Sequence, residues 1–339
     1  MREEGPAARA VSANCIGARW KVIVCGVFVL ITLSIQPVVA QSWPTKPVRM
    51  VVPFTPGGGS DIVGRVLAQK LSAALGQQVV VENRPGAGGR IGTEAVARAA
   101  PDGHTLLFAT SSVMVTAPAL YAKLGFQMPA DFAPISLVAS TAYVLVVHPS
   151  VPVRSVRDLI ALARRTPGKL TYASSGAGGP AHLAGELFTA LAGVTMIHVP
   201  YKGSAPGATS VMAGETDAMF SNLLPALPAI KAGRLRPLGI TSARPSTILT
   251  DVPTLNATLP GFDVEQLYGL LAPAHTSRDI VRRLNAETAK AVQNSEVRAK
   301  LLSDGSEVLI STPEEFERRI VAEIARWGKV IKAAGIKEE

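Results

Sequence analysis

Two glycine-rich turns contain the residues best suited to chemistry in this sequence. The turn Pro56-Gly57-Gly58-Gly59-Ser60-Asp61 follows an apolar run at 48–53, and residues 174–180 (Ser-Ser-Gly-Ala-Gly-Gly-Pro) follow a second run at 171–173. A helical pattern of apolar residues begins directly after each turn. The first backbone N–H groups of a helix have no intrahelical acceptor and point, with the positive end of the helix dipole, toward the space above the preceding strand. The turns therefore predict two anion sites, and two facing sites suit a ligand with two carboxylates.

The glycines allow a ligand oxygen to approach these N–H groups without meeting a side chain. Pro180 suits a first helical position, where its missing N–H is not needed. A tight connection without a ligand is the alternative for each turn taken alone. Neither turn ends in Gly-Lys-Ser/Thr, which argues against a phosphate-binding P-loop. Residues 176–181 match the dinucleotide pattern G-x-G-x-x-A, but the segment 196–199 that follows about 20 residues later has no acid for a ribose.

Catalytic and metal-ligating patterns are weak. The sequence has no G-x-S-x-G and no H-E-x-x-H motif. His182 and Glu186 are one helical turn apart without a third ligand nearby, so a hydrogen-bonded histidine is favoured over a metal site. His182 is also close enough to Pro180 to line a ligand site at the second turn. Asp61 is more typical of a helix start, and Asn83 of a turn, than of a general base. We expect no enzyme, no metal and no cofactor.

Short apolar runs alternate with helical patterns along the chain, which predicts an α/β architecture with parallel strands. Strands are expected at 48–53, 79–82, 105–110, 145–147, 171–173, 196–199, 218–220 and 238–240. Helices are expected at 61–75, 91–100, 156–165, 181–192 and 205–213, and the final stretch 277–336 is expected to be helical apart from 307–310.

The first forty residues have the order of a secretory signal peptide. Four basic residues precede an uncharged apolar run at 22–35, and Val38 and Ala40 are small enough for cleavage after Ala40. The run has 14 residues. As a helix it would span ~21 Å, less than the ~30 Å hydrocarbon core, which disfavours a membrane anchor. Cys25 lies inside the run after bulky residues, which disfavours a lipid anchor.

Loss of residues 1–40 would remove both cysteines, Cys15 and Cys25, and lower the net charge from +9 to +7, because the leader has four basic and two acidic residues. Without cysteines the mature chain cannot form disulfides, so its stability depends on burial of a hydrophobic core. Its length fits two domains, and an exported protein without cysteines fits a bacterial periplasm. Its basic residues are interleaved with acids, and aromatic residues make up 5% of the chain. This pattern argues against nucleic acid as a partner. The positive net charge remains compatible with the attraction of a small anionic ligand.

Seven segments together resemble the Bug family, the extracytoplasmic solute-binding receptors of tripartite tricarboxylate transporters. The resemblance covers residues 43–337 with matching order and spacing, and rests on 46–49 (Lys-Pro-Val-Arg), 51–61, 82–89 (Glu-Asn-Arg-Pro-Gly-Ala-Gly-Gly), 100–103 (Ala-Pro-Asp-Gly), 182–186 (His-Leu-Ala-Gly-Glu), 199–203 (Val-Pro-Tyr-Lys-Gly) and 270–273 (Leu-Leu-Ala-Pro).

The resemblance implies an α/β fold like that of type II periplasmic binding proteins, with two lobes, parallel-rich sheets and a hinge of two crossing segments near 143–147 and 266–271. Lobe 1 would comprise 43–143 plus 266–339, and lobe 2 would comprise 144–265. The lobes would close on a small carboxylate (a di- or tricarboxylate, or an aromatic carboxylate), for uptake by a transporter or for sensing. Membrane transporter subunits are the implied partners, and we expect a monomer.

Ligand contacts carried over by position fall on two lips and the base of a cleft. They are Phe54, Gly58, Gly59, Ser60 and Asp61 on one lip, Ser174, Gly176, Gly178 and His182 on the other, and Ser112 and Asn222 at the base. The chain departs from the family where Gly179-Pro180-Ala181 replaces frequent hydroxyl residues and where Ser221 replaces a frequent Asp. Without that acid a ligand ammonium loses a partner, so we expect a carboxylate that has no α-amino group.

Two other classes of function stay open at the level of the sequence. A secreted hydrolase would use His182 or Asp61 in the same cleft. The effector domain of a transcription regulator can share this fold, but the leader and the absence of an N-terminal helix-turn-helix pattern argue against that class.

Overall fold

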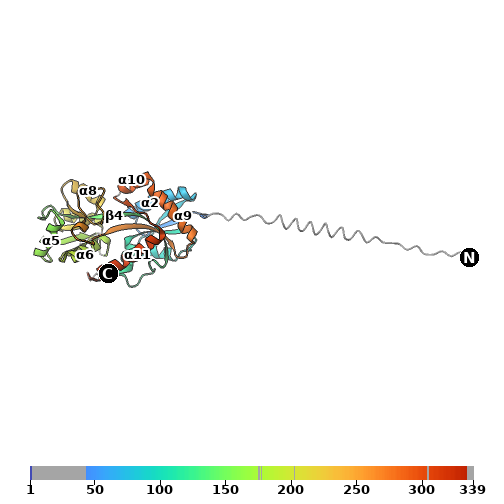
Figure 1. Cartoon of the computed structure of the whole chain (residues 1–339), viewed down its shortest axis with the longest axis horizontal. Helices are drawn as coiled ribbons and strands as arrows, with labels where there is room; N and C mark the ends of the chain where they lie inside the picture. The colour runs from blue at the N-terminus through green and yellow to red at the C-terminus, as the bar shows by residue number, and fades with distance from the viewer. Residues whose placement is uncertain (2–42, 175, 177, 202, 304, 334–339) are drawn as a thin grey trace. The chain divides into compact units, whose positions relative to one another are not determined.

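The computed structural model of the chain describes Met1 and residues 43–333, except 175, 177, 202 and 304 (Figure 1). The predicted cleavage site after Ala40, the apolar run 22–35 and both cysteines lie outside the described residues. In the part that is described, no helix combines the length and apolar character needed to cross a bilayer.

Ten strands of the described chain form one hydrogen-bonded network with two halves, which we call lobe 1 and lobe 2 (Figure 1). Lobe 1 contains β1 (Val48–Val52), β2 (Val79–Asn83), β3 (Thr105–Thr110), β9 (Glu265–Pro273), β10 (Glu307–Val308) and the first part of β4 (Phe132–Val147). Lobe 2 contains the last part of β4 with β5 (Thr171–Ser174), β6 (Ile197–Pro200), β7 (Ala218–Asn222) and β8 (Arg236–Ile240).

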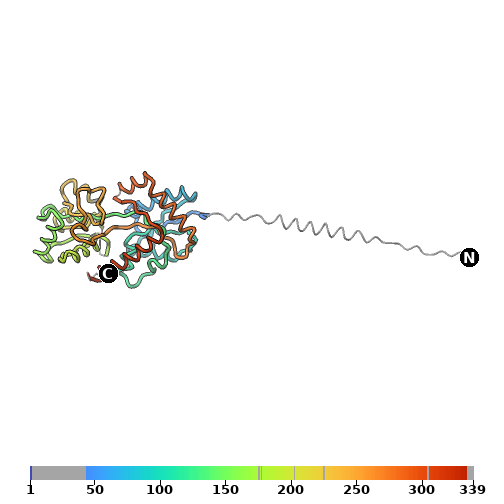
Figure 2. Tube along the Cα trace, viewed as in Figure 1, coloured from blue at the N-terminus to red at the C-terminus, as the bar shows by residue number. Residues whose placement is uncertain are grey.

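Strand β4 belongs to both lobes. Its residues 132–142 pair with β9, and its residues 143–147 pair with β7. With 16 residues it is ~50 Å long, far beyond a usual strand. The chain returns to lobe 1 beside this strand, where the buried Thr241 accepts from the Tyr143 N–H through Oγ1 and donates from the same hydroxyl to the Val264 carbonyl. Figure 2 shows the middle of the chain on one side and the flanking segments on the other.

The predicted parallel strands are found in both lobes: β1 pairs in parallel with β2 and β3, and β5 pairs in parallel with β6 and β7. The antiparallel pairs come from the long strands β4 and β9 and from the short strands beside them. β9 pairs with β3 and β4 within lobe 1, and its ladder with β4 begins at Glu265, one residue before the predicted crossing segment 266–271.

Helices cover both lobes. Those of lobe 1 are α2 (Gly59–Leu75), α3 (Arg90–Ala97), α4 (Ala117–Leu120), α9 (Arg278–Gln293) and α10 (Ser295–Ser303), with the short turns η1 (Ala87–Gly89) and η2 (Ser112–Thr116). Those of lobe 2 are α5 (Val156–Arg165), α6 (Pro180–Ala192), α7 (Ser204–Met212), α8 (Leu223–Lys231) and η3 (Leu255–Ala257). The last helix, α11 (Pro313–Ala333), packs against α4 of lobe 1 and α6 of lobe 2.

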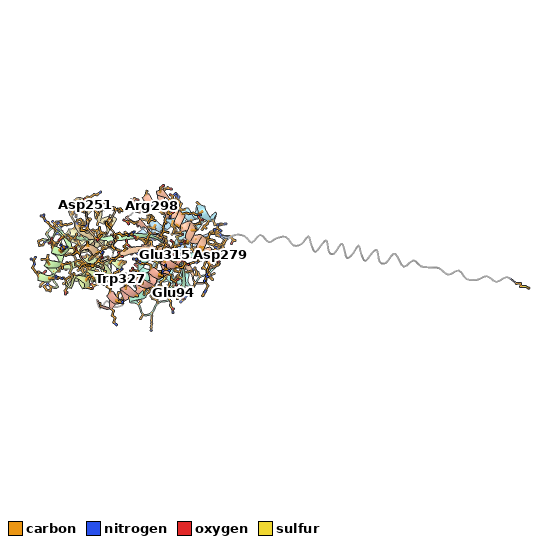
Figure 3. The ribbon with its side chains drawn as sticks, in the orientation of Figure 1. Glu94, Asp251, Asp279, Arg298, Glu315 and Trp327 are labelled. Carbon is orange, nitrogen blue, oxygen red and sulfur yellow. The ribbon has the colours of Figure 1, made fainter. Side chains whose placement is uncertain are left out.

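One hydrophobic core is shared by the two lobes through α11. The alternation of side chains along β4 sends Leu145 and Val147 into this core and Val144 and Val146 into a separate core of lobe 2. Phe316 of α11 is fully buried in the shared core. Charged residues such as Asp251, Asp279 and Arg298 are exposed at the periphery (Figure 3).

The contact between β9 and α11 predicts opposite effects for two glycine substitutions. A Cβ at Gly269 would lie 2.2 Å from Phe316 Cζ, whereas a Cβ at Gly328 in α11 would meet nothing within 4 Å. We expect Gly269→Ala to lower the free energy of unfolding by about 1–3 kcal/mol through overpacking. The control Gly328→Ala should raise it by about 0.5–1 kcal/mol, because alanine is the better helix former. Urea unfolding measures both, and a neutral Gly269→Ala would contradict the tight packing.

Candidate functional site

A small polar cavity of about 170 Å³ lies where strands of the two lobes meet. Register brings its walls together, since Thr110 at the end of β3 pairs with Tyr268 of β9, and Asn222 at the end of β7 pairs with Tyr143 of β4. We call this the inner cavity, and it is lined by Phe54, Ser60, Thr110, Ser112, Asn222, Gln266 and Tyr268.

The inner cavity presents polar groups with unused hydrogen-bonding capacity. Thr110 Oγ1 is buried and has no hydrogen-bond partner among the described residues. Asn222 Oδ1 accepts from Ser204 Oγ at 3.0 Å, which leaves the Asn222 amide N–H groups to donate. Gln266 Oε1 accepts from Tyr143 Oη at 3.3 Å, and burial raises the pKa of the Tyr143 hydroxyl, which keeps it a donor. A buried polar atom without a partner costs stability, so these groups are suited to a polar ligand.

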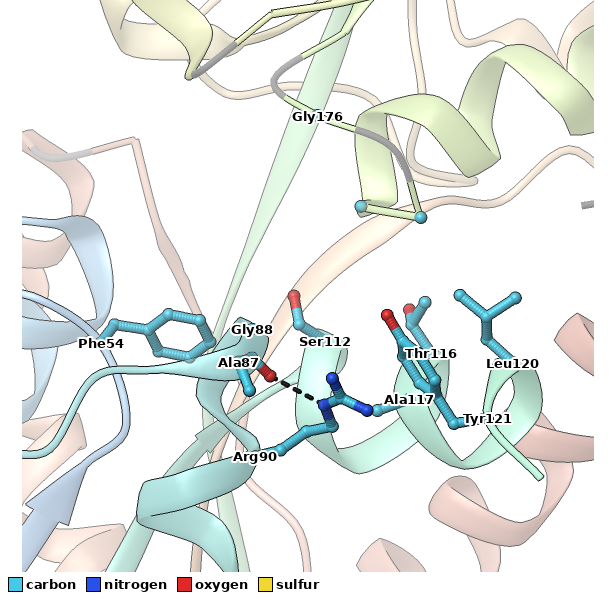
Figure 4. A pocket seen from close by; sticks show the side chains of 12 residues that line it. Phe54, Ala87, Gly88, Arg90, Ser112, Thr116, Ala117, Leu120, Tyr121 and Gly176 are labelled. Carbon is cyan, nitrogen blue, oxygen red and sulfur yellow. Dashed lines mark hydrogen bonds between the residues drawn. The ribbon is translucent and has the colours of Figure 1, made fainter. Parts of the chain in front are cut away.

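A second cavity of about 300 Å³, the outer cavity, lies between lobe 1 and the second glycine-rich turn (Figure 4). Phe54 and Ser112 line both cavities, so the two adjoin. The outer cavity is mostly apolar, with the Arg90 side chain at its wall. Its lining residues are Phe54, Ala87, Gly88, Arg90, Ser112, Thr116, Ala117, Leu120, Tyr121, Gly176, Gly178 and Gly179.

Charge in this region has one sign. None of the described residues lining the two cavities is acidic, and Arg90 is their charged member. The positive end of helix α2 adds to this potential, because Ser60 of its first turn lines the inner cavity. The arrangement is electrostatically matched to an anion.

Asp61 holds the first glycine-rich turn in shape. Its carboxylate accepts from the Gly57 N–H at 2.9 Å, from Arg65 at 3.0 Å and from Asn83 Nδ2 at 2.9 Å. Burial alone would raise the pKa of Asp61, but the hydrogen bonds from Arg65, Gly57 and Asn83 outweigh it and hold the pKa below its usual value. Asn83 Nδ2 also donates to the Phe54 carbonyl at 3.1 Å, so the same brace positions the ring of Phe54 at the cavities.

His182 holds the second glycine-rich turn in the same way. The Gly178 N–H donates to His182 Nδ1 at 2.9 Å, which leaves the ring proton on Nε2, 3.5 Å from Glu186 Oε1. The Gly176 N–H donates to Ser174 Oγ at 3.2 Å. Both N–H groups therefore have acceptors within lobe 2, although Gly176 and Gly178 themselves line the outer cavity.

A stack of rings lies beneath this turn. The rings of His182 and His198 are 3.8 Å apart and nearly parallel, and Tyr172 stacks on His198 at 5.0 Å. Tyr172 Oη donates to Glu186 at 2.5 Å, and His198 Nε2 lies 2.7 Å from Ser174 Oγ. Burial, with the neighbouring His182, lowers the pKa of His198 to about 4. The predicted local hydrogen bond of His198 is thus part of a packed polar cluster.

The predicted site residues divide into two sets. Those at the cavity walls are Phe54, Ser60, Ser112, Gly176, Gly178 and Asn222. Asp61, Ser174 and His182 are buried behind the turns, and Gly58 and Gly59 line neither cavity. Gly59 is packed closely, since a Cβ there would lie 2.9 Å from Tyr268 Oη. The region of His182 and Glu186 contains no cluster of metal-ligating residues in the part of the chain that is described.

Several cavity residues were missed by the sequence analysis: Ala87, Gly88, Arg90, Thr110, Thr116, Tyr121, Gln266 and Tyr268. A signal for the first three existed in the sequence. Residues 86–89 (Gly-Ala-Gly-Gly) form a third glycine-rich connection, between β2 and α3, with Gly88 and Gly89 both at positive φ. The residues of β9 gave no local signal, because their position depends on its pairing with β3 and β4.

The lowered pKa of His198 predicts a loss of stability in acid. The unfolded chain binds a proton on this residue near pH 6.5, whereas the folded chain does so near pH 4, so its contribution is complete above about 6.5 and lost as the pH falls toward 4. We expect His198→Asn to remove this component, on the order of 1 kcal/mol because the ring is half-buried and screened. Denaturant unfolding of both proteins at pH 7 and 4.5 measures it. Equal acid sensitivity of both would contradict the burial of His198.

A family model and a sequence relative assign the chain to the same family of receptors. The model of the "Tripartite tricarboxylate transporter family receptor" matches residues 63–336. BugT of Bordetella pertussis is 36% identical over 316 residues, which cover 93% of this chain and 97% of BugT.

Solved structures agree with this assignment. Rpa4515 of R. palustris with adipate superposes with a TM-score of 0.76 at 38% identity, and covers 87% of this chain and 99% of that one. MatC of Rhodopseudomonas palustris with bound malate gives 0.71 at 32% identity, over 85% of this chain and 100% of MatC. The periplasmic binding protein BugD gives 0.73 at 31% identity, over 88% and 100%. The chain belongs to the Bug family of tripartite tricarboxylate transporter receptors, as its motifs predicted.

Proposed function

We propose that this chain is a periplasmic receptor that captures a small carboxylate between its two lobes. The observation that carries the proposal is the inner cavity, where the buried and unpartnered Thr110 hydroxyl, the Asn222 amide and the first turn of α2 converge without an acidic side chain among the described lining residues. The structures of Rpa4515 with adipate and of MatC with malate support a carboxylate as the ligand.

We further propose that lobe 1 comprises residues 43–143 plus 266–339 and lobe 2 comprises 144–265, boundaries from which the strand ladders differ by one residue, since Tyr143 pairs with β7 and Glu265 with β4. The transfer of the β4 ladder from β9 to β7 between Ala142 and Tyr143 supports the first boundary. The clasp between Thr241, Tyr143 and Val264 joins the two crossing segments and is the proposed hinge. A carboxylate that contacts both lobes would stabilise the closed arrangement by its greater affinity for it.

The ligand contacts fall into two proposed roles. Phe54, Ser60, Ser112, Gly176, Gly178 and Asn222 would touch the ligand, which their place in the cavity walls supports. Asp61, Ser174 and His182 would act by holding the glycine-rich turns, with Gly58 and Gly59 forming the first turn. The carboxylate of Asp61 and Nδ1 of His182 are both engaged in this bracing, which supports binding without catalysis over a hydrolase that uses either residue.

We propose export through a signal peptide cleaved after Ala40, no cofactor, and action as a monomer. The bound receptor would present its ligand to membrane transporter subunits or to a sensing system. The family assignment supports the transporter as a partner.

The absence of acids from the described cavity walls predicts selection against an α-ammonium group. Malate and aspartate are a matched pair of dicarboxylates that differ in carrying a hydroxyl or an ammonium group. We expect malate and adipate to raise the melting temperature of the mature protein, and aspartate and glutamate to have little effect, because a buried ammonium without a counterion is costly. Aspartate binding more tightly than malate would contradict this.

The second glycine-rich turn predicts a binding defect that is separable from folding. Gly178 has φ 71°, and a Cβ there would lie 3.2 Å from Leu120 Cδ2 across the outer cavity. We expect Gly178→Ala to weaken adipate binding about tenfold, equivalent to about 1.4 kcal/mol, because the added methyl group enters the outer cavity. Titration calorimetry measures the loss.

Gly168→Ala is the matched control. Gly168 has φ 65° and open space around its Cβ position, and it lines neither cavity. It should lose stability through the same backbone strain and keep the adipate affinity of the unmodified protein. Equal affinities for the Gly178→Ala and Gly168→Ala variants would show that the second turn does not contact the ligand.

A further inference from the structure

Arg90 is fixed in place at the wall of the outer cavity. It begins helix α3, and its Nε donates to the Ala87 carbonyl at 2.9 Å. Its Cζ lies 4.1 Å from the centroid of the Tyr121 ring, within cation–π distance. In Figure 4 the guanidinium extends from α3 toward Tyr121 and Ala117, on the side of the cavity opposite Gly176. The hydrogen bond to Ala87 and the cation–π contact with Tyr121 thus restrict the Arg90 side chain in the absence of a ligand.

The charge of Arg90 is not neutralised by a described acid. Other arginines of lobe 1 form ion pairs. Arg65 pairs with Asp61, Arg84 pairs with Glu82, and Arg98, at the C-terminal end of α3, pairs with Glu94. Arg90 forms no such ion pair within the described part of the chain, and its Nη1 and Nη2 atoms make no hydrogen bond to a described residue. Two parallel donors of a guanidinium match the two oxygens of a carboxylate.

The outer cavity that Arg90 lines opens into the inner cavity. Phe54 and Ser112 line both cavities, and in Figure 4 Arg90 lies between Phe54 on one side and Leu120 on the other. The far end of the combined space holds the polar groups of the inner cavity, including Thr110 and Asn222. A ligand that extends from the inner cavity into the outer one therefore meets polar donors at one end and Arg90, the charged residue of the described lining, in the other cavity. A molecule with a second anionic group is complementary to this arrangement.

We infer that Arg90, held against Tyr121, is the anchor for a second carboxylate, and that the receptor selects linear dicarboxylates over monocarboxylates of the same chain length. This inference rests on the proposed function, since the first carboxylate occupies the inner cavity. It narrows the ligand to one of the classes that the family resemblance left open, and it assigns the specificity to a residue outside the two glycine-rich turns predicted to bind the ligand.

Adipate and hexanoate test the inference, because they share a six-carbon chain and differ in one carboxylate. Calorimetric titration of the mature protein should show adipate binding at least tenfold more tightly than hexanoate. Arg90→Gln should weaken adipate binding by about 10- to 100-fold, the effect of losing a charge-assisted bidentate pair, and leave hexanoate within about twofold. Arg90→Lys should weaken adipate binding by an intermediate factor, because lysine keeps the charge and loses the planar fork.

Arg98→Gln is the matched control, since it removes the same charge from the end of the same helix, and Arg98 lines neither cavity. It should leave both affinities unchanged. The unliganded melting temperature of each variant shows that the protein is folded. Equal weakening of both acids by Arg90→Gln, no weakening of adipate, or hexanoate binding as tightly as adipate would overturn the inference and leave carboxylate capture standing. Failure of the unmodified protein to bind either acid, or malate, would overturn both.

Discussion

The continuous hydrogen bonding of β4 through both lobes is the constraint on which the rest of the structure depends. Because the ladder passes from β9 to β7 between Ala142 and Tyr143, the ends of β3 and β7 are brought to the same place. Thr110 and Asn222, the polar residues at those ends, therefore line the same cavity although they are far apart in the sequence. The cavity thus forms at the point where β4 passes from one ladder to the other, next to the proposed hinge.

Acidic residues in this region act behind the cavities and not at their walls. Asp61 and Glu186 each accept hydrogen bonds that shape a glycine-rich turn, and in both cases these bonds lower the carboxyl pKa against the opposing effect of burial. These carboxylates interact with internal donors such as Arg65 and His182, and not with the cavities. The cavity walls are left with hydroxyl, amide and guanidinium groups. The same division explains how a chain with many acids can present a positive potential to a small anion.

The sequence was informative wherever a local pattern decided the structure. The strand at 105–110 and the helix at 156–165 were predicted with the observed bounds, because turn residues and helix caps mark their ends. Strand β4 was predicted over three of its residues, since its first part contains Pro134 and several small polar residues and is fixed by pairing with β9. Helix α8 was missed because it contains Pro228, which ordinarily ends a helix.

The walls of the two cavities were also predicted in part. Strand-to-helix turns were recognisable, because glycine has a local conformational role at positions such as Gly178. The bracing role of His182 was not, since it depends on the direction in which its ring points. Arg90 was missed for a related reason: its importance comes from Tyr121, which follows it by 31 positions and reaches it only through the fold.

The short segment that contains η2 and α4 follows β3 and lies outside the strand ladders. It contributes Thr116, Leu120 and Tyr121 to the outer cavity and none of its residues pairs in a described strand. Its first part is tied to the rest of the molecule, because Ser112 lines the inner cavity and Val113, Met114 and Val115 are buried in the shared core. Substitutions at its partly buried end, Leu120 and Tyr121, can reshape the outer cavity while the hinge and the inner cavity keep their contacts. A designer who wants a receptor for a new carboxylate therefore has two neighbouring positions to vary, Leu120 and Tyr121, without entering the buried stretch that precedes them.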